Sequence, residues 1–511
     1  MTYLRISVFL AGAAVMSAEM AAPRLLAPFF GASQTVWTNI IGVILAAMTA
    51  GAYVGGRLAD RWPSERIYAR ALALSGVALA AVPFASKPFL AYASIALARE
   101  AAGPFILSLV SVSLFFAPPV FMLAMISPWA LKLAAGEQRG GLGRVAGELS
   151  ALAAFGSIVG TFATSFALLP LLGTRDSILF VAAMLVAVGA VRAFERRTVT
   201  VAALVAASAI FAALHSACAG PVKYDPGTLY EKDSQYQYVQ VVSRGGYTLL
   251  LLNEGVCEHS AKPRRGYLTG GYWDCMSVLA ALSSKKGEPL RVLILGLAGG
   301  TMAWQLDHFY GDSRSLSIDG VEIDPAVVEA GRLHFGLDGI KSLKVYTADA
   351  RAFVREGRRG PYDLIIADAF RQPYIPFHLT TREFYESCRE LLSERGIFAI
   401  NLGTAVGEKT LVDSFTATFK SAFEHVYIFS LANDSIMFDN HIVVGARSPV
   451  SPSALADTDV AAELAASSLA KVKKTWRVPQ PPPSALVFTD DHAPVEFFIE
   501  SMILRRALSL N

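Results

Sequence analysis

Long apolar runs fill the first 216 residues of the chain and constrain its fold more than any other feature. The runs lie roughly at 6–30, 36–56, 67–86, 102–131, 145–170, 177–191 and 198–215. Each is close to or above the ~20 residues that an α-helix needs to cross a bilayer. The first run is too long for a signal-peptide core and leads straight into the second. We therefore expect residues 1–216 to form a transmembrane helical domain of seven spans, or eight if residues 88–133 hold two.

The composition agrees with a membrane protein and excludes several other classes. Of the 511 residues, 53% are hydrophobic and 17% are charged, whereas a soluble protein carries roughly 25% charged residues. The chain is therefore not wholly soluble, disordered or fibrous, and its length requires at least two domains. A net charge of +3 argues against a nucleic-acid partner. With four cysteines and no C-x-x-C pair or Cys/His cluster, neither a disulfide scaffold nor a bound metal is expected.

Two polar or small-residue features interrupt the apolar runs. Glu19 lies within the first run and Arg24 follows five residues later. A carboxylate inside a membrane is costly and faces a partner or a cavity. The two residues therefore form a membrane polar site on the path of a polar substrate, or they are structural, as a Glu19–Arg24 pair or a contact to another helix. Gly156 and Gly160 form a G-x-x-x-G face, which predicts close helix packing.

The basic loops leave the orientation of the domain in conflict. Lys and Arg gather at 57–70, 132–144 and 192–197, and such loops favour the cytoplasmic side. Seven spans with these loops inside would leave the C-terminal part outside. Eight spans would bring it inside but put two basic loops on the wrong side.

From about residue 217 the sequence becomes mixed, with ordinary turns and charges. Strand-like runs at 236–242 and 247–252 are separated by Ser243–Gly246, which is a hairpin signal. Further strands are expected at 291–295, 316–322, 343–346, 363–367 and 396–401, alternating with helices such as 273–282 and 301–310. This alternation predicts a parallel sheet covered by helices on both faces. The predicted domains are a small β-sheet cap at 217–285, a Rossmann-like nucleoside-binding domain at 286–448 and a C-terminal tail at 449–511 with a pocket-closing segment.

Several strand ends of the expected parallel sheet carry residues suited to a nucleoside. Gly296, Gly299 and Gly300 follow a buried strand and allow a ligand close to the backbone at a helix N-terminus. Glu322 ends the next strand, where an acid is placed to bind ribose hydroxyls. Asp349 and Ala350 follow another strand and are candidates for the adenine edge, and Asp368 follows a fourth. Ligands of open α/β sheets bind at such ends.

At these residues the chain resembles the spermidine synthase (polyamine aminopropyltransferase) family, and in particular bacterial membrane-fused spermidine-synthase-like proteins. The matching segments include L-Y-E-K-D-S-Q-Y-Q-Y-V-Q-V, L-T-G-G-Y-W-D, V-L-I-L-G-L-A-G-G-T, V-E-I-D-P, A-D-A-R, Y-D-L-I-I-A-D-A-F, P-F-H-L-T-T-R-E-F-Y and T-D-D-H-A-P-V-E, in family order. The resemblance implies a class I S-adenosylmethionine-type Rossmann-like domain with an N-terminal β-sheet. It also implies decarboxylated S-adenosylmethionine as cosubstrate, whose aminopropyl group moves to an amine as methylthioadenosine leaves.

The resemblance also implies roles for individual residues. Gln237 matches a glutamine that contacts the nucleoside, Glu322 the ribose-binding acid and Asp349 the residue near adenine. Asp368 matches the catalytic aspartate that orients and deprotonates the attacking amine. This role is physically reasonable, because an ammonium must lose a proton before its nitrogen can attack carbon.

The chain departs from the family at positions that set the acceptor. The glycine loop G-L-A-G-G lacks the family's aspartate, and Arg371 replaces a second aspartate. Tyr272, Trp273 and Asp274 stand where the family has Tyr-His-Glu. An arginine repels a diamine and favours an anion, so spermidine synthesis itself is not expected and the acceptor stays open.

Other residues near the expected site have two interpretations each. His378 is a candidate acid, base or acceptor ligand, or it makes a loop hydrogen bond. Trp273 and Tyr374 either stack on a ligand or pack. Asp490 and Asp491 either close the pocket or cap a helix. Cys257 and Cys275 are candidates for a disulfide if this part of the chain is extracytoplasmic, and are otherwise ordinary thiols.

Together these observations predict a membrane-anchored transferase of the bacterial inner membrane, with no metal. It would use decarboxylated S-adenosylmethionine or S-adenosylmethionine and act on a small-molecule amine or a membrane-borne acceptor. The alternatives are a polyamine or related solute transporter or sensor whose soluble part binds without turnover, and a methyltransferase. The cytoplasmic origin of the cosubstrate favours a cytoplasmic C-terminal part over a periplasmic one. A homodimer is left open, as is the question whether the spans transport or only anchor.

Overall fold

The computed structural model describes most of the chain in two compact units. The described residues are 1–31, 33–96, 103–137, 141–194, 201, 208, 212, 215, 221–223, 225–255, 257–285, 287–357, 359–369, 374–405, 407–431, 438–451 and 462–509. One unit, here the helical unit, consists of Met1–Tyr224 and Asp233–Tyr238. The other, here the α/β unit, consists of Asp225–Lys232 and Val239–Asn511.

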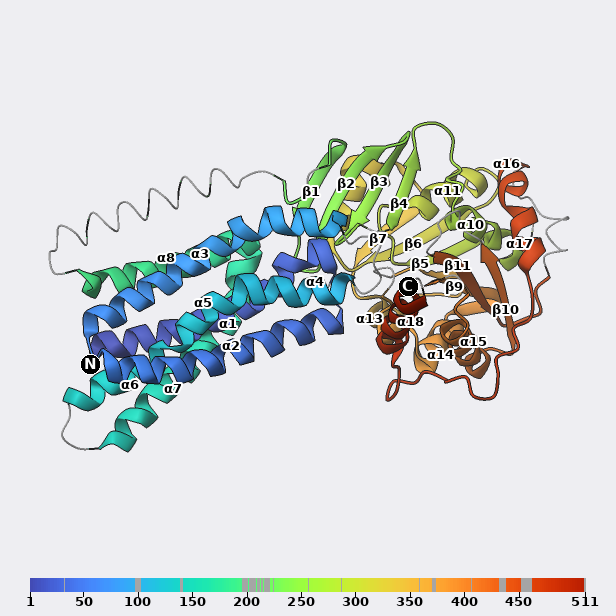
Figure 1. Ribbon diagram of the computed structural model, residues 1–511. Coiled ribbons are helices and arrows are strands. Elements are labelled where there is room, and N and C mark those ends of the chain that lie inside the picture. The colour runs from blue at the N-terminus through green and yellow to red at the C-terminus, as the bar shows by residue number, and fades with distance from the viewer. Residues whose placement is uncertain are drawn as a thin grey trace. The chain divides into compact units, whose positions relative to one another are not determined.

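The helical unit is a bundle of long apolar helices (Figure 1). Its elements are α1 (Thr2–Phe30), α2 (Gln34–Arg61), α3 (Glu65–Ala96), α4 (Gly103–Ser111), the π-helix η1 (Val112–Phe116), α5 (Ala117–Ala124), α6 (Ile126–Glu137), α7 (Leu142–Ala163), the π-helix η2 (Thr164–Leu168) and α8 (Leu169–Ala193). Long apolar sequences favour this architecture because a helix satisfies all its backbone hydrogen bonds internally.

Five helical stretches of the described residues are long and apolar enough to cross a membrane. They are Thr2–Phe30, Gln34–Arg61, Glu65–Tyr92, Phe105–Gly136 and Leu142–Ala193. The fifth is interrupted at Gly173, whose φ of 77° is not helical, so it contains two of the predicted runs. Residues 88–133 hold the end of one stretch and most of the next rather than two complete spans. The predicted run at 198–215 lies largely outside the described residues.

Small residues set the packing of these helices. A Cβ atom on Gly156 or Gly160 of α7 would lie within 2.3 Å of the backbone oxygens of Phe9 and Ala13 in α1, so only glycine allows this approach. The Thr164 hydroxyl donates to Ser17 farther along the same pair of helices, at 2.8 Å. The G-x-x-x-G prediction is therefore confirmed as a packing face between α1 and α7.

Arg24 does not pair with Glu19 among the described contacts. Its guanidinium donates to the backbone oxygen of Ser234 at 2.8 Å and to that of Gln235. Glu19 is partly exposed. The structural pair that the sequence left open is therefore wrong, and Arg24 instead holds the segment Asp233–Tyr238 within the helical unit.

The α/β unit contains two sheets. In the smaller sheet β1 (Thr228–Asp233), β2 (Tyr238–Arg244), β3 (Tyr247–Leu252) and β4 (Glu258–Pro263) follow in order. Arg244 pairs with Tyr247 across a two-residue turn, in which Gly245 and Gly246 have φ of 59° and 84°. Such positive φ values match the strand twist in a tight hairpin, and they confirm the predicted hairpin.

The larger sheet has seven strands in the order β10-β11-β9-β8-β5-β6-β7. The parallel strands are β5 (Leu290–Leu295), β6 (Leu316–Glu322), β7 (Leu343–Thr347), β8 (Tyr362–Ala367) and β9 (Leu392–Ala405), and the antiparallel pair is β10 (His425–Leu431) and β11 (Phe438–Ala446). The predicted Rossmann-like parallel sheet is confirmed. The sequence had not indicated β10 and β11.

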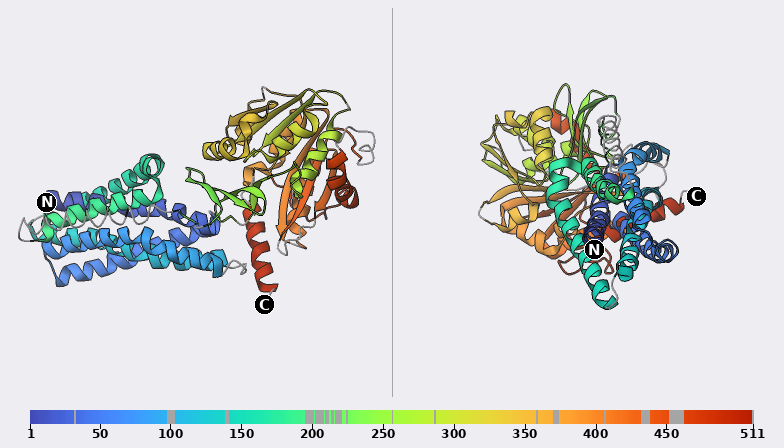
Figure 2. Two further views of the ribbon diagram at one scale, coloured as in Figure 1. Left: turned by 90° about the horizontal axis from the view of Figure 1, so that it is seen from above. Right: turned by 90° about the vertical axis from the view of Figure 1, so that its left-hand side faces the viewer.

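Helices cover both faces of this sheet (Figures 1 and 2). They are α10 (Tyr272–Ser283), α11 (Thr301–Tyr310), α12 (Pro325–Ala330), α13 (Ala350–Arg355), α14 (Arg382–Glu390), α15 (Thr410–Ala422), α16 (Ala462–Leu464), α17 (Ala470–Thr475) and α18 (Val495–Ser509), with shorter turns between them. Val292 and Ile294 of β5 pack with α10 and α11 on one face, whereas Leu293 and Leu295 pack with α13, α14 and α15 on the other. Residues 292–295 of β5 and 364–367 of β8 are apolar without interruption, because both faces of these strands are buried.

Candidate active site

The strand order brings the predicted site residues to one edge of the large sheet. The chain passes from β5 to β6 and β7 on one side, and then returns to β8 and β9 on the other. The point between β5 and β8 is therefore the topological switch point, where open α/β sheets bind ligands beyond the carboxyl ends of their strands. The loop after β5, Glu322 at the end of β6 and Asp368 after β8 all lie at this edge.

The loop after β5 approaches the end of β8 very closely. Gly296 has φ of 89°, and a Cβ atom there would lie 2.5 Å from Cα of Ala369 and 2.6 Å from the backbone oxygen of Asp368. The Asp368 amide also donates to the backbone oxygen of Leu295 at 2.8 Å. Gly296 is thus required for the contact that positions Asp368, a role different from the predicted contact with a ligand.

The backbone N–H groups of the same loop donate hydrogen bonds to other atoms of the protein. Gly296 and Leu297 both donate to the backbone oxygen of Val321, and Gly300 donates to that of Leu297. Ala298 donates to Glu322 Oε2 at 3.0 Å, and Gly299 to Ser260 Oγ at 2.8 Å. No N–H from Gly296 to Gly300 is left to bind a phosphate, unlike in loops that hold pyrophosphate.

Glu322 is a buried carboxyl that links two loops. Its Oε2 accepts from Ala298 N and its Oε1 accepts from Asp324 N at 3.1 Å. Burial raises the pKa of Glu322 to about 7, against the opposing effect of these backbone N–H groups. Each carboxyl oxygen keeps a lone pair for a further donor such as a hydroxyl.

Asp368 is held between a tyrosine and an asparagine. Tyr272 Oη donates to Asp368 Oδ2 at 2.7 Å, and Asn401 Nδ2 donates to Oδ1 at 3.2 Å. Burial raises the pKa of Asp368 to about 7, although both hydrogen bonds act to lower it. Burial and the neighbouring carboxylate raise the pKa of Tyr272 well above its ordinary value, so Tyr272 stays a donor. A carboxyl that titrates near neutral pH is suited to accept a proton in catalysis.

Asn401 is a site residue that the sequence had not identified. It lies in β9 next to Asp368, and its Oδ1 accepts from Asn440 Nδ2 of β11 at 2.8 Å. Because Asn440 fixes the side-chain oxygen, Asn401 turns its amide nitrogen toward Asp368. The signal that could have found it was a polar residue at the end of the otherwise apolar run G-I-F-A-I-N at 396–401.

Asp274, predicted to bind substrate, is committed to local structure. It is buried and accepts from Thr269 N, Thr269 Oγ1 and Gly270 N at 2.7–3.0 Å, and from Gln305 Nε2 at 2.6 Å. These bonds fix the loop before α10, and Tyr272, the first residue of α10, reaches Asp368. The buried Trp273 ring stacks on that of Tyr272 with centroids 4.4 Å apart, so it packs behind the tyrosine.

Asp349 and His378 lie together at the neighbouring strand end. Asp349 Oδ1 caps α13 by accepting from Ala352 N at 2.8 Å, and its Oδ2 lies 3.6 Å from His378 Nε2. Ala350, the first residue of α13, is buried. The described contacts of His378 are with Asp349, with the ring of Phe377 and, through its backbone oxygen, with Arg351, and none of these is with Asp368.

The tail motif T-D-D-H binds beside this pair. Asp490 accepts from Thr381 Oγ1 at 2.8 Å and from Arg351 Nη2 at 2.5 Å, and its own amide donates to Glu383. Arg351 and these partners hold the tail against the start of α14. The capping alternative does not apply to Asp490, because its carboxylate contacts side chains of other elements.

The remaining predicted residues are not brought to Asp368 by any described contact. Tyr374 packs against the apolar core between the sheet and α14, and Arg371 lies outside the described residues. Gln237 is buried in the turn before β2 and belongs to the helical unit.

Cys257 and Cys275 are free thiols, so the disulfide left open by the sequence is not formed. Within the described residues, no group of three His, Cys, Asp or Glu side chains is placed to hold a metal ion.

Comparison with known proteins identifies relatives of the α/β unit. The profile of the spermine/spermidine synthase domain matches residues 272–433. A polyamine aminopropyltransferase from Vibrio vulnificus (strain CMCP6) is 37% identical over 150 residues, which are 29% of this chain and 48% of that relative. The chain thus spans about half the length of this curated relative.

Two further relatives are a methyltransferase and a protein of solved structure. The mouse (Mus musculus) eEF1A lysine and N-terminal methyltransferase is 30% identical over 149 residues, covering 27% of this chain and 21% of that protein. A probable spermidine synthase from Corynebacterium glutamicum ATCC 13032 aligns over 52% of this chain and 97% of its own, at 18% identity and a TM-score of 0.38. That score is too low to support an assignment.

Proposed function

Because residues 272–433 of this chain belong to the spermine/spermidine synthase family, we propose that the α/β unit is a transferase with an adenosyl-sulfonium donor. The donor is decarboxylated S-adenosylmethionine or S-adenosylmethionine, and an aminopropyl-type group passes to an acceptor amine whose identity stays open. The observation that carries the proposal is Asp368. Its carboxyl has a pKa raised to about 7 and is held by Tyr272 and Asn401 at the switch point.

The proposed chemistry is a single displacement with Asp368 as general base. The acceptor nitrogen forms a bond to the donor carbon attached to sulfur, and the C–S bond breaks with its electron pair going to sulfur. The positive sulfonium becomes a neutral thioether, and the nitrogen's surplus proton goes to Asp368. A carboxylate with a pKa near 7 is deprotonated often enough to accept this proton and basic enough to draw it away.

The glycine loop and Glu322 support a nucleoside donor without phosphates. The loop has no free N–H between Gly296 and Gly300 for a pyrophosphate. Glu322 still has acceptor capacity for ribose hydroxyls. Asp349 and His378, at the next strand end, are proposed to contact the adenine side of the donor.

The acceptor is proposed to differ from the diamines of polyamine synthesis. Arg371 occupies the sequence position at which the resemblance places an acid, and Asp274 is occupied by four local hydrogen bonds. A dication would therefore find fewer acidic partners. An amine that also carries a negative group fits the altered charges better.

The helical unit is proposed to anchor this transferase in the bacterial inner membrane. Five apolar helical stretches support the proposal. The test is extraction of membranes from producing cells with alkaline carbonate. The chain should stay in the membrane pellet, and complete release into the supernatant would contradict anchoring.

The function itself is tested by mass spectrometry of the nucleoside product. Purified full-length protein would be incubated with each donor and a mixture of amines. Methylthioadenosine is the expected product. We expect Asp368→Asn to lower kcat by about 100-fold or more and Glu322→Gln to raise the KM for the donor at least about tenfold.

Asp338→Asn is the matched control, because Asp338 is an exposed acid of the same unit that pairs only loosely with Arg332. It should behave as the wild type. Wild-type turnover in both Asp368→Asn and Glu322→Gln would overturn the proposed site. S-adenosylhomocysteine as the product would make the protein a methyltransferase, as its likeness to the mouse relative suggests. Donor binding without any product would favour the transporter or sensor alternative.

A further inference from the structure

The helical unit has two chemically different ends. At the first, three ion pairs join neighbouring helices: Arg5 to Glu148, Asp60 to Lys132 and Glu65 to Arg192, at 2.6–2.7 Å. These pairs bring together the starts of α1, α3 and α7 and the ends of α2, α6 and α8, as Figure 1 shows near the N-terminus. We refer to this as the basic end.

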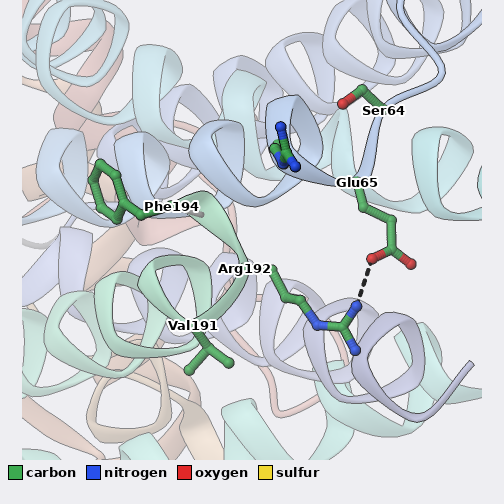
Figure 3. Close-up of a pocket in the computed structure, with 6 residues that line it drawn as sticks. Ser64, Glu65, Val191, Arg192 and Phe194 are labelled. Atoms are coloured by element: carbon green, nitrogen blue, oxygen red, sulfur yellow. Dashed lines mark hydrogen bonds and ion pairs between the residues drawn. The ribbon is translucent and has the colours of Figure 1, made fainter. Parts of the chain in front are cut away.

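A surface pocket of about 450 Å³ lies at the basic end, between the start of α3 and the end of α8. Figure 3 shows Arg192 reaching Glu65 across it, with Val191 and Phe194 on the apolar side. The Arg192 guanidinium also lies 5.5 Å from the Tyr3 ring, and Arg70 donates to the backbone oxygen of Ala193. Arginines above an apolar wall are the side chains expected beside the anionic headgroups of a cytoplasmic leaflet.

The basic side chains are unequally divided between the two ends. The described basic side chains at or next to the basic end are Arg5, Arg57, Arg61, Arg66, Arg70, Lys132, Arg144 and Arg192. The described ones toward the other end are Arg24, Lys87, Arg175 and Lys223. Short loops rich in Lys and Arg stay on the cytoplasmic side of a membrane, so the basic end is the cytoplasmic one.

The chain leaves the helical unit from the opposite end. His215 Nδ1 lies 2.9 Å from Asp176 Oδ1, and Lys223 lies over the Phe29 ring at 5.9 Å. Phe29 lies in the last turn of α1, and Asp176 lies just beyond the break at Gly173. Phe194 is at the basic end, and the 20 residues between it and His215 are about the number that one crossing of a bilayer needs.

The segment Asp233–Tyr238 marks the same exit point. Thr174 Oγ1 donates to Asp233 Oδ2 at 2.7 Å, and Arg24 donates to the backbone oxygens of Ser234 and Gln235. All of these residues belong to the helical unit, and they lie at the end far from Arg5, Lys132 and Arg192. The chain runs directly from this segment into the α/β unit at both of its ends.

We infer that the α/β unit, with its candidate transferase site, lies on the extracytoplasmic side of the inner membrane. The inference rests on the proposed membrane anchoring, and it reverses the orientation that the cytoplasmic origin of the cosubstrate favours. A sulfonium carries a permanent charge and does not cross hydrocarbon unaided. A transport step must therefore supply the donor to this site, and the acceptor is taken from the extracytoplasmic compartment.

The orientation is tested by labelling single cysteines with a membrane-impermeant maleimide in spheroplasts. The full-length parent carries Cys218→Ser and Cys257→Ser, because Cys275 and Cys388 are buried and burial raises the pKa of both thiols. Asp338→Cys reports on the α/β unit, where this side chain is 75% exposed. Trp62→Cys, at the exposed start of the α2–α3 loop, reports on the basic end.

Asp338→Cys should be labelled in intact spheroplasts and Trp62→Cys only after permeabilisation. Any result in which Asp338→Cys requires permeabilisation overturns the inference. Labelling of both without permeabilisation, together with release by carbonate, would refute membrane anchoring instead. The transferase proposal is judged separately, from the nucleoside product of the detergent-purified protein, so failures of the two are distinguishable.

Discussion

The chemistry of the candidate site depends on how a single carboxyl, Asp368, is surrounded. Burial favours its protonated form, whereas Tyr272 and Asn401 donate hydrogen bonds that favour the charged form. The balance leaves the pKa at about 7. Asn401 donates to the Asp368 carboxylate, whereas Asn440 donates to Asn401. Asn401 is therefore a positioning residue whose effect on the pKa of Asp368 is testable.

Asn401→Ala should move the pH profile of kcat/KM toward higher pH. Removing a donor to the charged carboxylate raises the pKa of Asp368 above about 7, and the base must be deprotonated to act. The acidic limb, along which activity rises with pH, therefore shifts upward by roughly one unit. The measurement is initial rate against pH from 5.5 to 9, and Asn440→Ala should shift the limb less. An unchanged limb with a lower kcat would show that Asn401 acts through packing alone.

At the scale of elements, the site depends on glycines that let backbones meet. The loop after β5 touches the end of β8 only because Gly296 has no side chain. The same physical requirement recurs in the helical unit, where Gly156 and Gly160 admit the α1 backbone. Both contacts join segments far apart in sequence.

Gly296→Ala should destabilise the α/β unit by about 2 kcal/mol or more. The new Cβ would lie 2.5 Å from the backbone of Ala369, at a φ of 89° that alanine rarely adopts. Gly339→Ala is the matched control, since its Cβ would meet nothing within 4 Å. The measurement is the midpoint of thermal unfolding, with labelling of the buried Cys388 as the probe of unfolding. Equal midpoints for the two variants would contradict the close approach.

Gly160→Leu should separate α1 from α7, because its side chain would enter the backbone of Ala13. Gly147 is an exposed position of the same helix, where a Cβ atom would meet nothing within 4 Å, so Gly147→Leu should be tolerated. The measurement is the fraction of monodisperse protein recovered after detergent extraction and heating. Equal recovery of the two variants would contradict the packing face.

At the scale of the whole molecule, the α/β unit carries two acids that destabilise it when they ionise. The pKa values of Asp368 and Glu322 are raised to about 7 by burial, against about 4 in an unfolded chain. Between pH 4 and 7 the folded state therefore binds more protons than the unfolded one. The contribution of each group to stability is present below pH 4 and is lost as pH rises toward 7.

Asp368→Asn should therefore raise the unfolding midpoint of this unit at pH 8 by a few °C, even though it lowers kcat by about 100-fold or more. The gain should vanish near pH 4, where the wild-type carboxyl is protonated and neutral. The measurement is Cys388 labelling against temperature at several pH values, with Asp338→Asn as the neutralised surface control. If the variant is less stable than the wild type at pH 8, then ionisation of the buried Asp368 does not lower the stability of the folded unit as proposed.

Local sequence determined much of this molecule. Apolar runs near 20 residues predicted the long helices, and strand-like runs predicted the central parallel strands, because these patterns follow from burial that each segment needs by itself. The sequence also placed Glu322 and Asp368 at one edge of the sheet, where the structure has them, because the carboxyl ends of parallel strands share an edge; their binding and catalytic roles stay predictions. Asn401 was missed, since its partner Asp368 lies 33 residues away and pairing across neighbouring strands leaves no local pattern.

The tertiary structure decided what depends on contacts between distant segments. Asp274 and Gly296 were predicted to bind ligands, and that stays a prediction. The structure shows that each also has a structural role: Asp274 accepts hydrogen bonds from Thr269, Gly270 and Gln305, and Gly296 lies against the backbone of Ala369. Residue types state which interactions a side chain is able to make, and only the fold selects among them. The sequence likewise determined where the basic residues stand along the chain. The contacts of Arg24, Thr174 and His215 decided from which end of the helices the chain departs.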